Sequence, residues 1–228
     1  MEVIMEKLTV ENVSYTYQGK YQKVQALKNV SCTFEKQKFY AIVGHSGSGK
    51  TTLLSILAGL GVPTEGAIYV DDTRIKEIES ERHRRENVSV IYQAFNLFPS
   101  LTVLENVMYP MEIAHMPKKT AVKRAKELLD SVNITEIHFK KFPTMLSGGE
   151  QQRVAIARAL ASNAKVILAD EPTGNLDTEN GEIVIDILKK LVREESYCVI
   201  VVTHDLGIAA QADMVYRMTD GVLIMEEN

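Results

Sequence analysis

A glycine-rich segment that begins at Gly44 constrains this chain more than any other feature of its sequence. Residues 44–51 read Gly-His-Ser-Gly-Ser-Gly-Lys-Thr and match the pattern G-x-x-x-x-G-K-[ST]. Glycines let the backbone turn with several N–H groups pointing inward, which makes a cradle for an anion. The apolar run 39–43 before the loop is typical of a buried strand, and residues 51–60 after it follow a helical pattern. Strand, loop and helix in this order predict a phosphate-binding loop rather than a merely structural glycine turn.

The residue types in this loop predict a nucleotide polyphosphate with its metal ion as the ligand. We expect Lys50 to reach the β- and γ-phosphates and the Thr51 hydroxyl to bind Mg²⁺. The other predicted contacts come from the loop and the helix start: Gly44, His45, Ser46, Gly47, Ser48, Gly49 and Thr52.

A second pattern places two carboxylates at the end of an apolar strand. Residues 166–169 are continuously apolar, and Asp170 and Glu171 follow directly. Adjacent strand residues face opposite sides unless the strand ends between them, so a break here would separate the two roles. We expect Asp170 to hold Mg²⁺, directly or through water, and Glu171 to accept a proton from the attacking water. A solvated strand end would explain Asp-Glu better if it stood alone, but the phosphate loop reverses that preference.

Other apolar segments predict an α/β fold with two kinds of strand. Short continuous runs suit parallel strands buried on both faces: 39–43, 88–92, 166–169 and 199–203. Alternating segments suit antiparallel strands with one solvated face: 7–17, 30–34 and 66–70. A hairpin is expected at Thr219-Asp220-Gly221, between the apolar runs 214–218 and 222–225.

A region punctuated by prolines separates the second and third buried runs. We expect Thr120 to cap a helix whose apolar face carries Ala121, Ala125, Leu128, Leu129 and Val132. No repeat or linker divides the chain, so we predict one domain over residues 1–228. Residues 1–93 and 162–228 would form the catalytic core with an antiparallel β-subdomain, and 94–161 an inserted helical subdomain.

Residues 146–153, Leu-Ser-Gly-Gly-Glu-Gln-Gln-Arg, are the most specific segment for the class of protein. They resemble the signature of ATP-binding-cassette (ABC) ATPases, and further motifs of that family follow in the expected order over nearly the whole chain. The resemblance implies a P-loop NTPase (RecA-like) core with a parallel central sheet, an antiparallel β-subdomain and an inserted helical subdomain. It also implies an ATPase that uses ATP and Mg²⁺.

The resemblance gives further residues a role. Tyr17 looks like the aromatic that stacks on adenine, with an ordinary surface aromatic as the alternative. Gln93 looks like the Q-loop glutamine, which senses the γ-phosphate and is a candidate metal ligand. Asp177 looks like the D-loop aspartate, and His204 like the switch histidine that contacts the γ-phosphate. With Lys50 and Glu171, Gln93 and His204 complete the expected catalytic set.

The resemblance also implies a head-to-tail homodimer formed on ATP binding. Ser147, Gly148 and Gly149 begin a predicted helix, which makes a second anion-binding helix start besides the one at Lys50. The family binds one ATP per phosphate loop, so Ser147 of one copy would cap the γ-phosphate held by Lys50 of the other. ATP would then hold the two copies together, and hydrolysis would release them.

Within the family, the segment 170–177 and the phosphate loop look most like the macrolide-efflux and lipoprotein-release (MacB/LolD-like) branch. This implies a separate integral-membrane permease subunit that the ATPase drives. Residues 93–104 are the expected interface, and their apolar side chains are either its anchors or subdomain core: Phe95, Leu97, Phe98 and Leu101. The alternative is an FtsE-like or other non-transport cassette, such as a cell-division or DNA-repair ATPase. The basic run 82–85 is a solvated helix face or a permease contact.

Composition agrees with a protein that reaches a membrane only through another chain. A formal net charge of −4 argues against gripping nucleic acid by bulk charge. There is no apolar run of membrane-spanning length, and residues 1–7 lack the features of a secretory signal. Cys32 and Cys198 are expected to be reduced, buried thiols, and no Cys/His cluster has zinc-ligand spacing. We therefore expect a cytoplasmic protein, peripheral on the inner face of the cell membrane.

Overall fold

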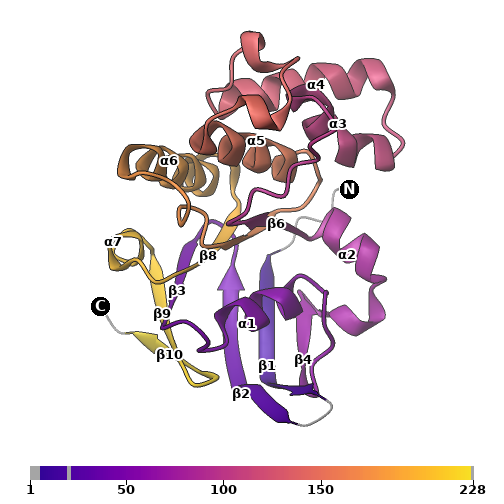
Figure 1. Cartoon of the computed structure of the whole chain (residues 1–228). Coiled ribbons are helices and arrows are strands. Elements are labelled where there is room, and N and C mark those ends of the chain that lie inside the picture. The colour runs from indigo at the N-terminus through magenta and orange to yellow at the C-terminus, as the bar shows by residue number, and fades with distance from the viewer. Residues whose placement is uncertain (1–5, 20–21, 227–228) are drawn as a thin grey trace.

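A mixed six-stranded sheet forms the centre of the computed structural model, which describes residues 6–19 and 22–226 (Figure 1). The strand order is β10-β9-β3-β8-β7-β6, and only β10 runs antiparallel to its neighbour. The strands are β3 (Phe39–Val43), β6 (Val88–Tyr92), β7 (Val166–Asp170), β8 (Cys198–Thr203), β9 (Met214–Thr219) and β10 (Val222–Glu226). The predicted buried parallel strands are confirmed. So is the hairpin, whose turn residues Asp220 and Gly221 have positive φ angles of 49° and 82°.

A second, antiparallel sheet of order β2-β1-β4-β5 covers one side of the molecule. Its strands are β1 (Lys7–Gln18), β2 (Lys23–Glu35), β4 (Glu65–Val70) and β5 (Thr73–Arg74). Strand β2 begins seven residues before the predicted start at Val30, because its register against β1 continues to the pair Lys23 and Gln18. The added residues are mostly exposed and polar, so they carry no clear alternation from which a strand could be predicted.

The helices occupy three places in the chain. Helix α1 (Lys50–Leu57) follows the glycine-rich loop, and α2 (Ser80–Glu86) leads into β6. Between β6 and β7 lie α3 (Val103–Ile113), α4 (Lys118–Ser131) and α5 (Gly148–Leu160), with single 3-10 turns at Glu136–His138 and Pro143–Met145. Helices α6 (Thr178–Glu195) and α7 (Leu206–Ala209) follow β7 and β8. Among the described residues, no helix combines the length and apolar character that crossing a membrane requires.

Two predicted helix ends are wrong. Helix α4 begins at Lys118 directly after Pro117, and the Thr120 side chain caps nothing; its backbone N–H donates to the Pro117 carbonyl. Proline suits a helix start because its fixed φ is already helical and no N–H is lost there. Helix α1 ends at Leu57 instead of residue 60, because Gly59 takes a positive φ of 68° that terminates the helix.

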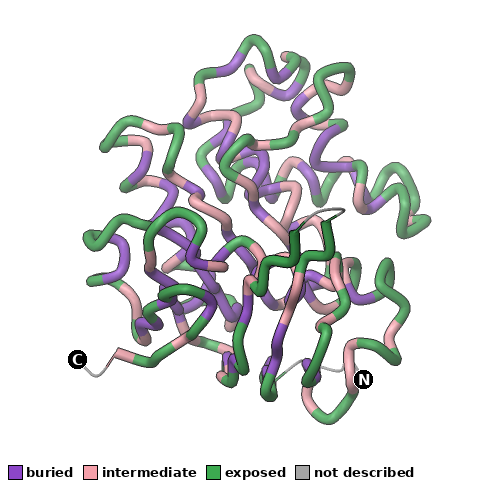
Figure 2. Tube along the Cα trace, turned by 60° about the horizontal axis from the view of Figure 1, so that its bottom comes forward, coloured by how far each residue is buried: buried purple, intermediate pink, exposed green. Residues whose placement is uncertain are grey.

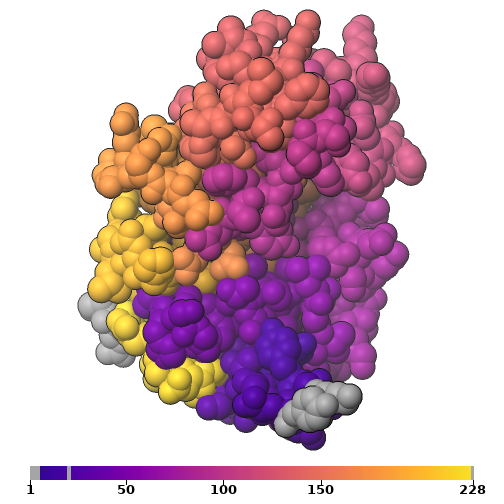
Figure 3. Space-filling model, viewed as in Figure 1, coloured from indigo at the N-terminus to yellow at the C-terminus, as the bar shows by residue number. Residues whose placement is uncertain are grey.

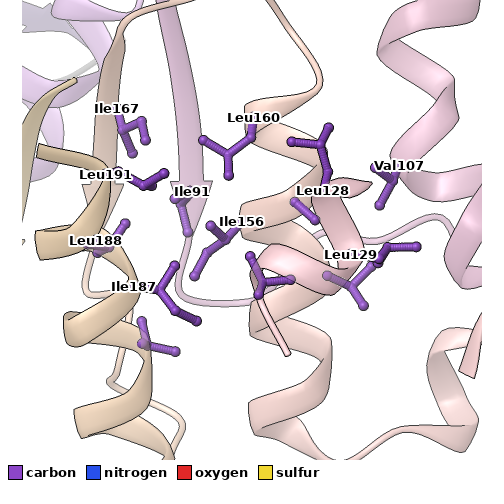
Figure 4. Packing of buried hydrophobic residues seen from close by; sticks show 14 of the residues in the cluster. Ile91, Val107, Leu128, Leu129, Ile156, Leu160, Ile167, Ile187, Leu188 and Leu191 are labelled. Atoms are coloured by element: carbon purple, nitrogen blue, oxygen red, sulfur yellow. The ribbon is translucent and has the colours of Figure 1, made fainter. Parts of the chain in front are cut away.

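Alternate residues of the central strands feed two apolar cores. In β8, Val199 and Val201 join a cluster with helices α3 to α6, whereas Ile200 and Val202 join a cluster with α1 and the antiparallel sheet. Figure 2 shows the buried residues concentrated along the central strands, with the exposed residues on the outer loops and turns. In Figure 4, Ile156 of α5 lies between the side chains of β6 and α6 and those of α4. Both faces of the central sheet are therefore covered by apolar clusters, and several of the predicted site residues lie at the ends of its strands.

The basic run 82–85 is only partly solvated. Arg82 and Arg85 are exposed and pair with Glu86, but His83 is completely buried. Its Nε2 donates to the carbonyl oxygen of Leu57 at 2.9 Å and satisfies the end of α1. The prediction of a solvated helix face is therefore wrong for His83. The prediction for the cysteines holds in part, because both thiols are free but only Cys198 is fully buried and Cys32 is partly exposed.

Candidate functional site

The glycine-rich loop closes tightly over the start of α1 because three of its positions have no room for a side chain or need a left-handed backbone. A Cβ on Gly44 would lie 2.3 Å from the Met218 carbonyl oxygen, and one on Gly49 would lie 2.5 Å from that of Ala26. Gly47 and Gly49 have φ angles of 77° and 112°. The loop thus turns into the helix N-terminus, where free N–H groups attract an anion.

Lys50 lies at the centre of this loop. Its ammonium group donates to the carbonyl oxygens of Gly44 at 2.8 Å and His45 at 3.0 Å, and the residue is 6% exposed. An open cavity of about 570 Å³ adjoins it, within the usual size range of small-molecule sites. The cavity unites predicted residues from three parts of the chain: Tyr17, Ser46, Gly47, Gly49, Lys50, Thr51, Thr52 and Glu171. In Figure 3, where colour marks residue number, indigo, purple, orange and yellow segments meet in the central part of the face shown, so residues distant in the sequence are neighbours there.

The remaining loop residues lie around this cavity and do not line it. The Nδ1 atom of His45 is 2.8 Å from the Ser46 carbonyl oxygen, and its Nε2 is 3.6 Å from Asp220 Oδ1, so the ring points to the β9–β10 turn. The Ser48 hydroxyl is buried and has no hydrogen-bond partner among the described residues.

The loop and the end of β7 meet at a pair of oxygen-bearing side chains. The Thr51 hydroxyl donates to Asp170 Oδ1 at 3.2 Å. The pKa of Asp170 is raised above its ordinary value, chiefly because the carboxyl group is buried and also because the Glu171 carboxylate is close. The Thr51 hydrogen bond and the Lys50 charge oppose this rise in pKa but do not cancel it. A desolvated carboxylate gains most from a neighbouring cation, and a hydroxyl with a carboxylate is a donor set that suits Mg²⁺. The residues present therefore fit the expected metal ion.

Strand β7 ends between its two acidic residues. Asp170 is the last strand residue, and Glu171 takes a left-handed φ of 45° while its N–H donates to the Val202 carbonyl oxygen. This conformation is strained for a residue with a side chain, and such strain is concentrated at functional sites. The break turns the Glu171 carboxylate toward the cavity, where Oε2 lies 2.9 Å from His204 Nδ1. The expected separation of the two carboxylates is confirmed, and Glu171 and His204 form a pair.

Gln93 lies beside the segment that follows β7, at residues 174–175. Its side-chain amide nitrogen is 3.4 Å from Asn175 Oδ1, and the Asn175 amide donates to the Gln93 carbonyl oxygen at 2.9 Å. A Cβ on Gly174 would come within 2.7 Å of the Gln93 side chain. Asn175 was not predicted from the sequence, although its place between Glu171 and Asp177 could have singled it out.

Tyr17 is 49% exposed at the mouth of the cavity. Its hydroxyl lies 3.2 Å from that of Thr52, and Tyr15 packs edge-on against it with ring centroids 4.9 Å apart. This ring is therefore held in place by Tyr15 and Thr52 while about half of the residue remains exposed at the cavity.

The segment 147–149 lies at the start of α5, next to the start of α6. Ser147 caps α5 in a capping box with Glu150, which the pattern S-x-x-E could have revealed from the sequence. A Cβ on Gly148 would meet Leu176 at 3.6 Å, and one on Gly149 would lie 2.1 Å from Asn180 Oδ1. Asp177 caps α6 and accepts from the Asn180 N–H at 2.8 Å. Within the described part of the chain, these residues lie with each other and do not line the cavity at Lys50.

Comparison with known proteins identifies the family to which this chain belongs. The family described as ABC transporter matches residues 27–174. The chain belongs to the ABC transporter family. It is 40% identical to an uncharacterised ABC transporter ATP-binding protein, MJ0796, of Methanocaldococcus jannaschii, with 96% of each chain covered. It is 43% identical to the lipoprotein-releasing system ATP-binding protein LolD of Saccharophagus degradans, over 93% of this chain and 94% of that one.

A solved structure of the same family shares the fold. The dimeric post-hydrolysis state of the ATP-binding cassette MJ0796 bound to ADP and Pi superimposes with a TM-score of 0.89 at 40% identity, covering 96% of this chain and 98% of that one. The chain described here is therefore an ABC cassette that binds ATP and is an ATPase coupled to transport. The predicted RecA-like fold is confirmed. Nothing in these relatives favours the alternative of a cell-division or DNA-repair cassette.

Proposed function

We propose that this cassette closes head to tail with a second copy, with an ATP molecule sandwiched at each of two shared sites. The observation that carries the proposal is the separation, within one described chain, of the cavity at Lys50 from the helix start at Ser147. Each has its own free N–H groups for an anion. A partner copy would bring its Ser147, Gly148 and Gly149 to the γ-phosphate that Lys50 holds, with Asp177 beside them. The MJ0796 cassette, which is similar to this chain, is described as dimeric, and this supports the pairing of two copies.

Within each site, the chain's own residues would divide the work. Lys50, the loop amides and the start of α1 bind the phosphates, and Tyr17 stacks on the base. Glu171 accepts the proton of the attacking water while His204, 2.9 Å away, orients its carboxylate and contacts the γ-phosphate. Thr51 and Asp170, with Gln93, would hold Mg²⁺, which supplies charge neutralisation at the phosphates.

The output of the cycle is a movement passed to a separate permease subunit. The Arg158 guanidinium of α5 donates to the carbonyl oxygens of Asn96 at 2.6 Å and Phe95 at 3.1 Å and lies 5.8 Å from the Phe98 ring centre. This ties the segment after Gln93 to the helix that starts at Ser147. Residues 94–161 would therefore act as a helical subdomain that couples the γ-phosphate to the permease. Such a cassette acts at the inner face of the membrane.

Phe98 marks the proposed permease contact on this segment. It is 38% exposed, packs against the equally exposed Tyr109 at 4.6 Å, and gives the segment 93–104 an apolar anchor. In contrast, Leu97 packs against the main apolar cluster of the helical region. The similarity to LolD supports a partner of the lipoprotein-release type.

The substitution Glu171→Gln tests the hydrolytic role. Loss of a general base is expected to slow ATP hydrolysis about 10²- to 10⁴-fold, while ATP binding persists. Lys50→Ala is the control for binding, because it removes the cation that the loop holds. Steady-state phosphate release and equilibrium ATP binding separate the two effects. Full turnover by Glu171→Gln would refute the assignment.

A further inference from the structure

At the start of α5, a series of side-chain contacts links Ser147 through Glu150 to His138, and the proposed function leaves this series unexplained. Glu150, one turn into α5, accepts at Oε2 from the Ser147 backbone N–H at 2.7 Å and from the Ser147 hydroxyl at 2.9 Å. Its other oxygen, Oε1, lies 3.1 Å from Nε2 of His138. His138 belongs to the 3-10 turn twelve residues upstream, and its Nδ1 is 3.2 Å from the Thr135 hydroxyl. The imidazole thus connects two elements by its two nitrogens.

This series of contacts is largely sheltered from solvent. The His138 and Glu150 side chains are 15% and 24% exposed, which is less than most of the other ion pairs in the described residues. Burial raises the pKa of Glu150, but the Ser147 hydrogen bonds and the charges of His138 and Arg153 bring it below its ordinary value. The carboxylate is therefore ionised while it contacts Ser147.

An ionised carboxylate at this place creates an electrostatic problem. In the proposed dimer the Ser147 hydroxyl turns its single proton from Glu150 to the partner copy's γ-phosphate, so that Glu150 Oε2 keeps only the Ser147 backbone N–H as a donor. The Glu150 carboxylate and the γ-phosphate, with only the Ser147 hydroxyl between them, repel each other, especially once dimer closure excludes water. A donor on the far oxygen of Glu150 holds the carboxylate on the flank of α5 and draws its charge away from the phosphate. His138 is that donor, and Arg153 is the other charged group that faces Glu150.

We propose that His138 is a positioning residue for the ATP-bound dimer: it fixes Glu150 so that Ser147 and the first N–H groups of α5 face the partner copy's γ-phosphate. This inference rests on the proposed head-to-tail dimer. His138 does not touch the nucleotide and acts only through Glu150. Its loss therefore weakens dimer closure and leaves ATP binding at Lys50 of the single copy unchanged.

The test uses the full chain with Glu171→Gln as the parent, so that ATP is retained. The dimer dissociation constant in ATP and Mg²⁺ is measured by sedimentation velocity, and ATP affinity at low protein concentration by equilibrium titration. His138 acts on the dimer only through Glu150, so its loss is expected to cost what one hydrogen bond of ordinary strength is worth, roughly five- to tenfold per site. Because the dimer has two sites, His138→Ala should weaken it about 25- to 100-fold with unchanged ATP affinity. His138→Gln, which keeps a donor, should recover much of the loss.

A second background separates positioning from a general loss of structure. Glu150→Gln keeps an acceptor for Ser147 but removes the carboxylate charge, so adding His138→Ala to it should weaken the dimer far less. His115→Asn, at an exposed left-handed position after α3, is the matched control and should behave like the parent. Urea unfolding of each variant without nucleotide confirms that it folds.

The outcomes distinguish this inference from the proposed function. If the parent dimerises and His138→Ala dimerises equally well, the role of His138 is refuted and the sandwich stands. If His138→Ala causes the same loss whether Glu150 is intact or carries the substitution Glu150→Gln, the role of His138 is refuted as well. A parent that stays monomeric overturns the sandwich and this inference together.

Discussion

Gly149, the second glycine of the segment 146–153, should be needed for the stability of the single chain, independently of any contact with ATP. A Cβ on Gly149 would lie 2.1 Å from Oδ1, 2.4 Å from Cγ and 2.9 Å from Cβ of Asn180. The whole Asn180 side chain would have to move, because the clash reaches its Cβ. Gly149→Ala therefore breaks the contact between the start of α5 and the start of α6.

The size of the effect follows from the bonds that Asn180 makes. Its side-chain amide donates to both carboxylate oxygens of Asp177 at 3.0 Å, and its Oδ1 accepts from Arg153 at 3.2 Å. Three such bonds are worth about 3 kcal/mol together, at roughly 1 kcal/mol each. Alanine returns about 1 kcal/mol through its better helix propensity. We expect Gly149→Ala to lower the free energy of unfolding by about 2 kcal/mol.

The neighbouring glycine provides the matched control. A Cβ on Gly148 would meet its nearest atom, Leu176 Cδ2, at 3.6 Å, which is an ordinary contact. Gly148→Ala gains the same helix propensity without a clash, so it should be as stable as the parent or up to about 1 kcal/mol more stable. Urea titration followed by far-UV circular dichroism, without nucleotide, measures both variants. At a slope of about 2–3 kcal/mol per M, Gly149→Ala should shift its midpoint down by about 0.7–1 M. Equal midpoints for the two variants would refute the argument.

Two further predictions concern α2 and the permease contact. Burial lowers the pKa of His83 in the folded chain, so the unfolded chain binds its proton more readily, and stability should fall as the pH drops below about 6.5. His83→Gln should flatten this part of the stability profile between about pH 7.5 and 5.5, measured by urea unfolding, and an unchanged profile would contradict the assignment. Phe98→Glu should prevent co-purification with the membrane subunit while ATP binding persists, and normal assembly would count against the proposed interface.

The sequence predicted the central strands and the loop well, because their signals are local. Continuous apolar runs mark strands that are buried on both faces, as in β3 and β8. The start of β2 escaped prediction because its pairing with β1 is set across the sheet and its residues face solvent. The cap at Thr120 failed because Pro117 supplies the helix start, and two competing start signals three residues apart were both present.

Much of the cavity lining was predictable from motif spacing, but its connections were not. The contact between Thr51 and Asp170 joins residues 119 positions apart, and it follows only from the order of β3, β8 and β7 in the sheet. Burial of His83 was hidden because it stands among arginines. The contact of His138 with Glu150 depends on a 3-10 turn folding back on α5, which no periodic pattern announces.

We infer that one copy alone cannot complete the ATP site, because the cavity at Lys50 and the helix start at Ser147 lie apart within one chain. The most direct measurement is the molar mass of Glu171→Gln by light scattering across a protein concentration series, with ATP and Mg²⁺ and with ADP and Mg²⁺. We expect the molar mass to double with ATP only, and Ser147→Arg, which puts a bulky side chain at the N-terminus of α5, should abolish that doubling. A molar mass that stays at 25.5 kDa in ATP and Mg²⁺ at every concentration would contradict it.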